Sequence, residues 1–262
     1  MNFFLVKFKK AFPKKIRVLI HKIYFDYVMI LFEKTPFFKN IYFRNIQLPK
    51  NQNIIDPKTK SLIRHNLYEN YEIEAIEEME IWDNNFLDLG SSIGLCSYIV
   101  SSNMNKNHKH ILVEPNKELI EYSKLLISKT EHSNNLFINK AIGYDYANAM
   151  FDPGPNTLSG KIISYEPRKD FPIIECTQIE NIIKENEIDS FNVLIDIEGY
   201  SFYPLFKEEL IMQKCKKIIL EESFESEYTA EKVFEQLKNL GFEIVYNQKT
   251  WGSNIIGAIK LQ

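Results

Sequence analysis

Short apolar runs alternate with amphipathic segments along most of the chain beyond residue 80. Phe86–Leu89, His110–Val113 and Phe191–Asp196 are nearly continuous apolar runs, the pattern of strands buried on both faces. Lys117–Ser128, between the second and third of them, has the length and spacing of a helix. Alternating strands and helices predict an α/β fold with a doubly wound, mostly parallel sheet, whose ligands bind at the carboxyl ends of the strands.

The same pattern predicts the other elements and two irregular segments. Further strands are expected at Asn135–Asn139, Ile173–Thr177, Lys217–Leu220, Phe242–Tyr246 and Asn254–Lys260, and further helices over Ser61–Trp82, Gln178–Asn186 and Glu227–Leu240. Leu48–Lys60, rich in proline and asparagine, reads as a connection. Tyr144–Phe171 reads as a long, turn-rich loop, a place where substrates are often recognised.

The first strand runs directly into a glycine turn with the sequence D-L-G-S-S-I-G, from Asp88 to Gly94. Glycine lets the backbone approach a ligand, and the free N–H groups of the following helix face the same crevice. Gly90 and Gly94 are four residues apart, which differs from the G-x-G-x-x-G of dinucleotide sites, and Asp88 would repel a pyrophosphate. The turn therefore suits a nucleotide with a cationic end, such as S-adenosylmethionine (SAM), although an ordinary turn with a capping acid remains an alternative.

Two more strands end in acids. His110–Val113 is followed by Glu114, 24 residues after Gly90, at the spacing from which a carboxylate accepts hydrogen bonds from both ribose hydroxyls. The strand that begins at Phe191 ends in Asp196-Ile197-Glu198-Gly199. Acids at three strand ends are hard to explain by packing alone, and they favour a nucleotide site at this edge.

In this order, D-L-G-S-S-I-G, V-E-P-N, K-A-I-G and I-D-I-E-G resemble the FkbM family of SAM-dependent methyltransferases, over roughly residues 68–222. The sequence differs from the usual family pattern at two places, neither of which is one of the acids or glycines. Ser91-Ser92 stand where the family usually has Ala-Asn, and Leu194 stands where it usually has lysine. The resemblance implies a class I methyltransferase, or Rossmann-like, fold with a seven-stranded sheet whose last strand is antiparallel.

The strand ends and the resemblance together give the candidate site residues. Those expected to bind the cofactor are Asp88, Gly90, Ser91, Gly94, Glu114, Pro115, Asn116, Ala141, Ile142 and Asp196. Ala141 and Ile142 are expected to hold the adenine through backbone and apolar contacts. The family places serines of the long loop near the acceptor, so Thr157 and Ser159 are the matching hydroxyls, with Glu221 as a further substrate contact.

Methyl transfer to an alcohol needs a base, or a metal that lowers the hydroxyl pKa. None of the five histidines lies at a predicted strand end, so Asp196 and Glu198 are the first catalytic candidates. Like-charge crowding between them would raise the pKa of one carboxyl, and the pair would equally suit a divalent cation. The sequence leaves the choice between a base and a metal open.

Charge divides the chain into two parts. Residues 1–50 hold eleven Lys and Arg against Asp26 and Glu33, a net charge of +9, so the remaining residues carry −12 of the overall −3. The apolar run within 16–32 is interrupted by charge and too short to span a membrane. This basic, aromatic-rich helical appendage either packs on protein, the reading we favour, or lies on an anionic membrane surface, and residues 51–262 form the methyltransferase domain. Nucleic acid is not an expected partner.

The sequence thus favours a SAM-dependent O-methyltransferase acting on a small molecule or glycan, through resemblance a sugar hydroxyl in polysaccharide or metabolite biosynthesis. Cys96, Cys176 and Cys215 show no paired or metal-ligand spacing, which indicates a reducing, cytoplasmic location, with the inner face of the membrane as a variant. Two other classes stay open: a non-catalytic scaffold in a biosynthetic complex, against which the intact acids argue, and a nicotinamide-dependent oxidoreductase, against which the glycine spacing and Asp88 argue.

Overall fold

The computed structural model describes residues 40–49, 54–144, 146–154, 160–164, 171–223, 229–250 and 253–261. The chain divides into two compact units, Met1–Tyr68 and Glu69–Gln262. Most of the basic segment 1–50 lies outside the described residues, so its helical character stays a prediction. No helix in the described part of the chain is long and apolar enough to cross a membrane.

In the first unit, the described residues form a short hairpin and a helix. Strands β1 (Tyr42–Phe43) and β2 (Ile46–Gln47) pair antiparallel, and helix α4 spans Pro57–Arg64. The Asp56 side chain caps α4 by accepting the backbone N–H groups of Lys58 and Thr59. The expected connection over 48–60 is therefore wrong at its end, because Pro57 occupies the first helical position, where its missing N–H costs no hydrogen bond.

The expected single helix over Ser61–Trp82 is also wrong. Helix α4 ends at Arg64, and the chain becomes helical again only in α5 (Asn70–Met79), followed by the short 3-10 helix η4 (Ile81–Asp83). Asn66 and Glu69 have φ angles of 54° and 50° between the two helices. A left-handed residue cannot continue a right-handed helix, so these two positions separate α4 from α5.

The second unit is built on a seven-stranded sheet, as expected. Its strands are β3 (Asn85–Leu89), β4 (His110–Val113), β5 (Asn135–Ile138), β10 (Phe191–Ile195), β11 (Cys215–Ser223), β12 (Phe242–Lys249) and β13 (Ser253–Lys260). They are ordered β12-β13-β11-β10-β3-β4-β5. The five strands from β11 to β5 are parallel, and β13 pairs antiparallel with both β11 and β12. This confirms the Rossmann-like fold and its antiparallel last strand.

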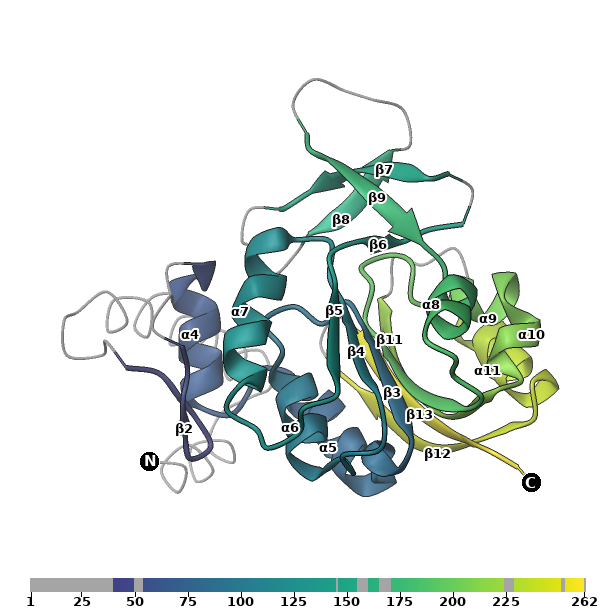
Figure 1. The fold of residues 1–262 in the computed structure, drawn as a ribbon. Helices are drawn as coiled ribbons and strands as arrows, with labels where there is room; N and C mark the ends of the chain where they lie inside the picture. Colours follow the sequence, from purple (N-terminus) through teal and green to yellow (C-terminus); the bar gives the residue numbers. More distant parts are fainter. Residues whose placement is uncertain are drawn as a thin grey trace, which may run out of the picture. The chain divides into compact units, whose positions relative to one another are not determined.

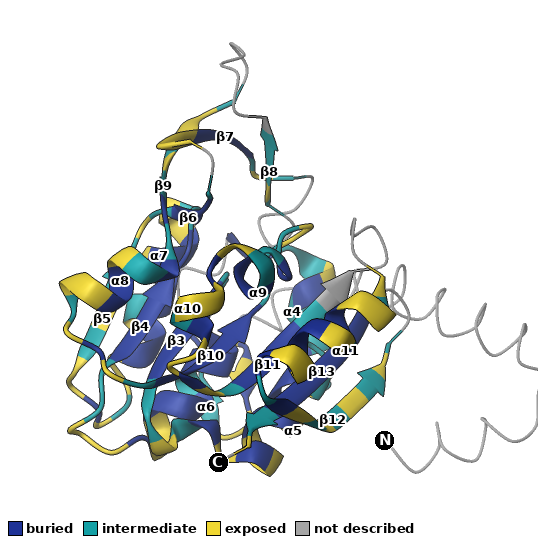
Figure 2. Ribbon diagram, turned by 90° about the vertical axis from the view of Figure 1, so that its right-hand side faces the viewer, coloured by how far each residue is buried: buried dark blue, intermediate teal, exposed yellow. Residues whose placement is uncertain are grey.

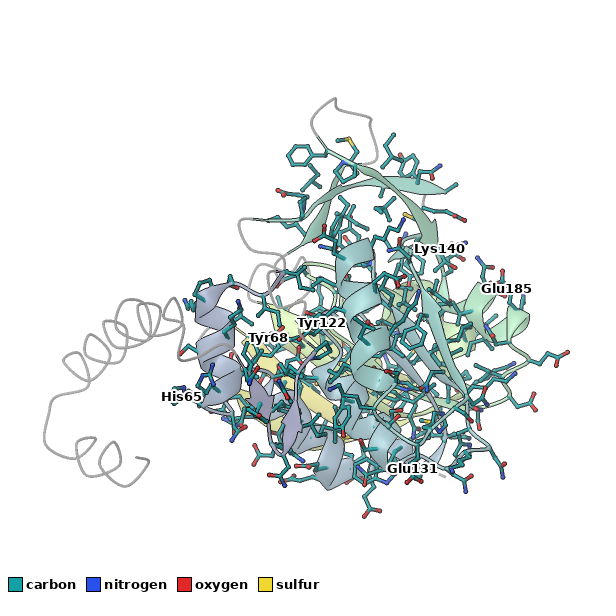
Figure 3. All side chains as sticks on the ribbon, turned by 60° about the vertical axis from the view of Figure 1, so that its left-hand side comes forward. His65, Tyr68, Tyr122, Glu131, Lys140 and Glu185 are labelled. Carbon is teal, nitrogen blue, oxygen red and sulfur yellow. The ribbon has the colours of Figure 1, made fainter. Side chains whose placement is uncertain are left out.

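Helices cover both faces of this sheet (Figure 1). One face carries α5, α6 (Leu95–Asn103) and α7 (Lys117–Ile127); the other carries α8 (Ile179–Glu185), α9 (Tyr203–Lys207), α10 (Glu209–Met212) and α11 (Ala230–Asn239). Leu87 and Leu89 pack toward α8, α9 and α11 within one large apolar core. The central strands are buried along their whole length (Figure 2). Figure 3 shows Tyr122 of α7 in the interior, whereas Glu131 and Glu185 lie at the surface.

A second, four-stranded sheet stands beyond the carboxyl ends of the large one, in the order β6-β9-β7-β8 (Figure 1). Its strands are β6 (Ala141–Ile142), β7 (Asn148–Asp152), β8 (Lys161–Ser164) and β9 (Ile173–Thr177). The expected irregular loop over 144–171 is therefore wrong for β7 and β8. Met150 and Phe151 are buried there because β7 pairs with β8 and β9, which the turn-rich sequence did not reveal.

Candidate active site

The sheet reverses its direction of winding between β3 and β10. The chain proceeds from β3 to β4 and β5 on one side and from β10 to β11 on the other, which makes the carboxyl ends of β3 and β10 the topological switch point. The backbone N–H of Asp196 donates to the Leu89 carbonyl at 2.9 Å, so the two strand ends lie directly against each other. In open α/β sheets this is where ligands bind.

Gly90 makes this close approach feasible. Its φ is +88°, and a Cβ added to it would lie 1.9 Å from the Asp196 carbonyl oxygen. The turn continues through Ser92 (φ 49°) to Gly94, which precedes α6 with a φ of +80°. A Cβ on Gly94 would lie 2.7 Å from Cβ of Ser123 on α7. Both glycines are therefore required by torsion and by space.

Glu114 is tied to the glycine turn by its two carboxylate oxygens. Oε2 accepts the backbone N–H of Ser92 at 2.9 Å, and Oε1 accepts that of Asn116 at 2.8 Å. The side chain is only 6% exposed, and burial raises its pKa to about 7 against these two hydrogen bonds, which lower it. Each oxygen keeps a lone pair for a further donor such as a ribose hydroxyl. Asn116 itself caps α7 by accepting the N–H groups of Glu118 and Leu119.

Asp88 lies behind the turn, against α6, and is 1% exposed. One of its oxygens lies 2.5 Å from Ser97 Oγ, which lies 3.0 Å from His110 Nε2, and His110 Nδ1 lies 2.9 Å from Asn135 Oδ1. Burial raises the pKa of Asp88 to about 7 and lowers that of His110 to about 3. No sequence motif indicates this row of hydrogen-bonding groups, because Ser97 and His110 are ordinary members of a helix and a strand.

A complete set of hydrogen bonds along this row requires one shared proton. Asn135 Nδ2 donates to the His132 carbonyl, so Asn135 Oδ1 faces His110 and can only accept. His110 Nδ1 must then donate, and the neutral ring can accept from Ser97 through Nε2. Ser97 has a single hydroxyl proton: it donates to an ionised Asp88, and it can donate to His110 only when Asp88 is protonated and donates to Ser97 Oγ. Full ionisation of Asp88 breaks one link unless the proton moves to His110.

Asp196 belongs to a second group of acids, from three elements. Its side chain is hydrogen-bonded to Glu221 of β11, and Glu72 and Glu69 of α5 lie near it. Burial, then the charge and hydrogen bond of Glu221, raise the pKa of Asp196 well above its ordinary value. Burial and the charge of Glu221 also raise the pKa of Glu72 to about 7. Glu221, from a distant strand, is therefore a crowding carboxyl in addition to the expected one: Glu198 is exposed and lines the same pocket as Asp196, and its effect on Asp196 stays a prediction.

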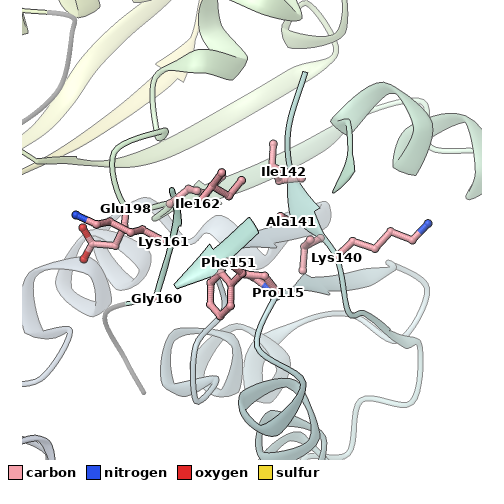
Figure 4. A pocket seen from close by; sticks show the side chains of 12 residues that line it. Pro115, Lys140, Ala141, Ile142, Phe151, Gly160, Lys161, Ile162 and Glu198 are labelled. Atoms are coloured by element: carbon pink, nitrogen blue, oxygen red, sulfur yellow. The ribbon is translucent and has the colours of Figure 1, made fainter. Parts of the chain in front are cut away.

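Two pockets adjoin at this edge. The first, which we call the apolar pocket, is shown in Figure 4; its walls come from the large sheet's edge and from the small sheet. It is lined by Gly90, Val113, Pro115, Lys140, Ala141, Ile142, Phe151, Gly160, Lys161, Ile162, Ile197 and Glu198. The second, which we call the acidic pocket, is lined by Asp196, Ile197, Glu198, Gly199, Ser201, Glu221 and Ser253. Ile197 and Glu198 line both, so the pockets share a wall.

The structure therefore brings most of the candidate residues to one edge of the sheet. Gly90, Pro115, Ala141 and Ile142 line the apolar pocket, and Asp196, Glu198 and Glu221 line the acidic one. Thr157 and Ser159 lie outside the described residues. Glu69 and Glu72 were missed as individual positions, because an acid on a helix gives no signal until the helix is placed against the strand ends. Among the described residues, no group of three or more His, Cys, Asp or Glu is arranged to hold a metal ion.

No protein-family model matches this chain, and no curated protein matches it. Among solved structures, it is similar to magnesium protoporphyrin IX methyltransferase from Synechocystis with bound SAM, at 11% identity and a TM-score of 0.44, covering 90% of this chain and 97% of that one. It is also similar to a putative rRNA methylase from Clostridium thermocellum, at 9% identity and a TM-score of 0.46, covering 73% and 96%. A precorrin-6y C5,15-methyltransferase from Geobacter metallireducens matches at 15% identity and a TM-score of 0.39, covering 73% and 88%. The assignment of the fold rests on the strand order described above.

Proposed function

We propose that this chain is a SAM-dependent methyltransferase that methylates a hydroxyl group. One observation carries the proposal: the hydrogen-bonded carboxyl pair of Asp196 and Glu221 lies in a pocket that shares a wall with the apolar pocket at the glycine turn. A nucleoside cofactor in one pocket and an acceptor in the other would meet at that wall. Asp196, at the end of β10, would face the point of transfer.

The residues present fit SAM. The Ser91 hydroxyl on the glycine turn is buried and has no hydrogen-bond partner among the described residues, which suits a polar ligand group at the turn. Glu114 has lone pairs for the ribose, and Pro115, Ala141 and Ile142 offer apolar surface for the base. The acids around Asp196 complement the cationic amino and sulfonium groups. SAM, when bound, supplies a methyl group activated by its positively charged sulfur.

The chain's own contribution is to orient the acceptor and to remove its proton. A carboxyl whose pKa is raised above its ordinary value is a better general base than an ordinary aspartate, because its carboxylate form binds a proton more tightly. The Glu221 hydrogen bond and the burial of Asp196 supply that shift. Ser201 and Ser253 at the pocket wall add hydroxyls near the same carboxyl pair.

The finer parts of the proposal rest on the sequence. The four ordered motifs from Asp88 to Gly199 support an FkbM-type enzyme, and with it a sugar hydroxyl of a surface glycan or glycosylated metabolite as acceptor. The basic segment 1–50 would then set location or assembly and leave the chemistry to the acids.

Isothermal titration of the full chain tests the cofactor. Binding of SAM and S-adenosylhomocysteine, with no binding of NAD, is expected; tight NAD binding without SAM binding would overturn the proposal in favour of an oxidoreductase. Mass spectrometry of glycans from a deletion strain tests the acceptor. A methyl group lost from a sugar on deletion, and restored by the intact gene, is expected, whereas SAM binding without any lost methyl group would favour a scaffold.

A further inference from the structure

The small sheet supplies the outer wall of the apolar pocket. Phe151 at the end of β7 and Ile162 of β8 face across the pocket from Pro115, Ala141 and Ile142 (Figure 4). Phe151 is 4% exposed, although it stands on a thin sheet outside the main core. Phe151 and Ile162 are register partners on paired strands, and the Phe151 N–H donates to the Pro172 carbonyl at 3.0 Å. The backbone that carries the aromatic ring is therefore held on both sides, by β8 and by the hydrogen bond to Pro172.

Gly160 fixes the place of the ring. A Cβ added to Gly160 would lie 2.3 Å from Cζ and 2.8 Å from Cε2 of Phe151. The φ of Gly160 lies outside the left-handed range, so a left-handed torsion is not what favours glycine there. The glycine is thus required by space alone: any side chain would displace the Phe151 ring. A contact that demands glycine next to an aromatic ring, at a pocket wall, indicates that the ring's position matters to the pocket.

We propose that Phe151 is a positioning residue for the purine base of the cofactor, and that Gly160 is required to keep its ring in place. The base would lie between the Phe151 ring on the small sheet and the apolar surface of Pro115, Ala141 and Ile142 on the large one. This inference rests on the proposed function and extends it to the small sheet. Flat bases bind well between an aromatic ring and apolar groups, because both faces are removed from water.

The difference in polarity between the two pockets favours the purine base, rather than the acceptor, as the occupant of the apolar pocket. Glu198 is the one side chain that can accept a hydrogen bond among the described residues lining the apolar pocket, so a sugar there would leave most of its hydroxyls without an acceptor, which is costly. The carboxyl groups and serine hydroxyls that could satisfy a sugar gather in the acidic pocket instead. The charged side chains of the apolar pocket's lining are Lys140, Lys161 and Glu198, and Figure 4 shows that of Lys140 pointing away from the others.

The test compares two ligands that share the base. S-adenosylhomocysteine carries adenine and an amino-acid part, whereas methylthioadenosine carries adenine without the amino-acid part. Titration calorimetry should show Phe151→Leu weakening both by a similar factor, about 5-fold or more, the lower part of the range for losing an aromatic stack on a base. Gly160→Ala should weaken both as well, although Phe151 is kept. Ile173→Ala, on the same small sheet but 60% exposed and outside the pocket, is the matched control and should change neither.

Melting temperature is measured alongside. Unchanged dissociation constants in a folded Phe151→Leu protein, with wild-type binding intact, would overturn the inference and leave the proposed function standing. A loss confined to S-adenosylhomocysteine would also overturn it, since the damage would then lie at the amino-acid end. If the wild type binds neither ligand, both the inference and the proposed function are wrong. Should Phe151→Leu fail to fold, Gly160→Ala decides by the same criteria.

Discussion

Glu114 Oε2 accepts the backbone N–H of Ser92 at 2.9 Å, which joins the end of the second strand to the turn after the first. The carboxylate thus helps to build the turn before any ligand arrives. Its partner oxygen does the same for Asn116 at the start of α7. A residue that the sequence suggests only as a ribose ligand therefore also holds two backbone donors.

Glu114→Gln is expected to weaken S-adenosylhomocysteine binding by about 1–3 kcal/mol, because the amide nitrogen would face one of the two backbone N–H groups and the charge is lost. Titration calorimetry measures it. Glu118→Gln, on the first turn of the following helix, is the matched control. Equal affinity in wild type and Glu114→Gln would show that this carboxylate does not contact the ligand.

Gly90→Ala should destabilise the fold by more than about 3 kcal/mol, since it combines a left-handed torsion with a Cβ that would overlap the Asp196 carbonyl. Gly199→Ala separates the cost of the left-handed torsion from the cost of the steric overlap. Its φ is also positive, at +75°, but nothing lies within 4 Å of the added Cβ, so about 1–2 kcal/mol is expected. Urea unfolding gives both values; similar losses for the two variants would contradict the close contact between the ends of β3 and β10.

Asp196→Asn should lower turnover by about 10²–10⁴ with the fold retained, because the amide cannot accept the acceptor's proton. Turnover is followed as methylated glycan formed in cells of the deletion strain that carry the variant. Glu198→Gln changes an exposed carboxyl on the shared pocket wall and should cost far less. Near-normal turnover of Asp196→Asn would move the role to Glu198 or Glu221.

The pH dependence of turnover gives a second check on Asp196. Its pKa is raised by burial and by Glu221, and the base must be ionised, so turnover should increase as pH rises through that raised pKa. EDTA treatment of the wild type distinguishes a base from a metal ligand, since only a metal-dependent enzyme loses activity. Because the proposed mechanism uses the Asp196 carboxylate itself as the base, we expect activity to persist.

Asp88 should make the folded protein less stable as the pH rises. Its pKa is about 7 in the folded protein and about 4 in an unfolded chain, so protonation favours the folded state. The stability that it contributes is complete below pH 4 and is lost as pH rises to about 7, by up to about 1.4 kcal/mol per pH unit. Asp88→Asn can donate to Ser97 at every pH, so the variant should gain on the wild type over this range. If the unfolding free energies of the wild type and of Asp88→Asn change with pH in the same way from pH 4 to 8, the shared proton is ruled out.

The basic segment 1–50 gives a prediction independent of the site. If it docks on membranes by charge, the full chain should bind anionic but not neutral vesicles. That binding should fall steeply as salt shortens the screening length from about 10 Å at 0.1 M to about 3 Å at 1 M. Absence of binding to anionic vesicles at low salt would favour packing on protein.

The sequence predicted those features whose cause is local. Phe86–Leu89 and Phe191–Asp196 are nearly continuous apolar runs because both faces of their strands are covered, so the hydrophobic pattern alone reveals them. Asp88 lies within β3 and behind the turn, against α6. Glu114 and Asp196 follow strands directly, and parallel strands bring their carboxyl ends to one edge. Their common location could therefore be predicted without knowing any contact.

What the sequence did not predict depends on contacts between distant segments. Whether Glu221 crowds Asp196 depends on the pairing of β10 with β11. The shared proton between Asp88 and His110 needs Ser97 from a helix and Asn135 from another strand. Strands β7 and β8 lie in a turn-rich stretch and become regular only because β9 is present to pair with β7.

The position of β13 between β11 and β12 has a consequence for how the protein is made on the ribosome. Strand β11 is complete when residue 223 has been synthesised, but its neighbour in the sheet begins only at Ser253. Until then β11 presents an unpaired edge, and such edges invite pairing with other chains. The β12–β13 hairpin must therefore add to the sheet as a unit, late in synthesis, and a nascent chain stalled before residue 253 should be the form most prone to aggregate.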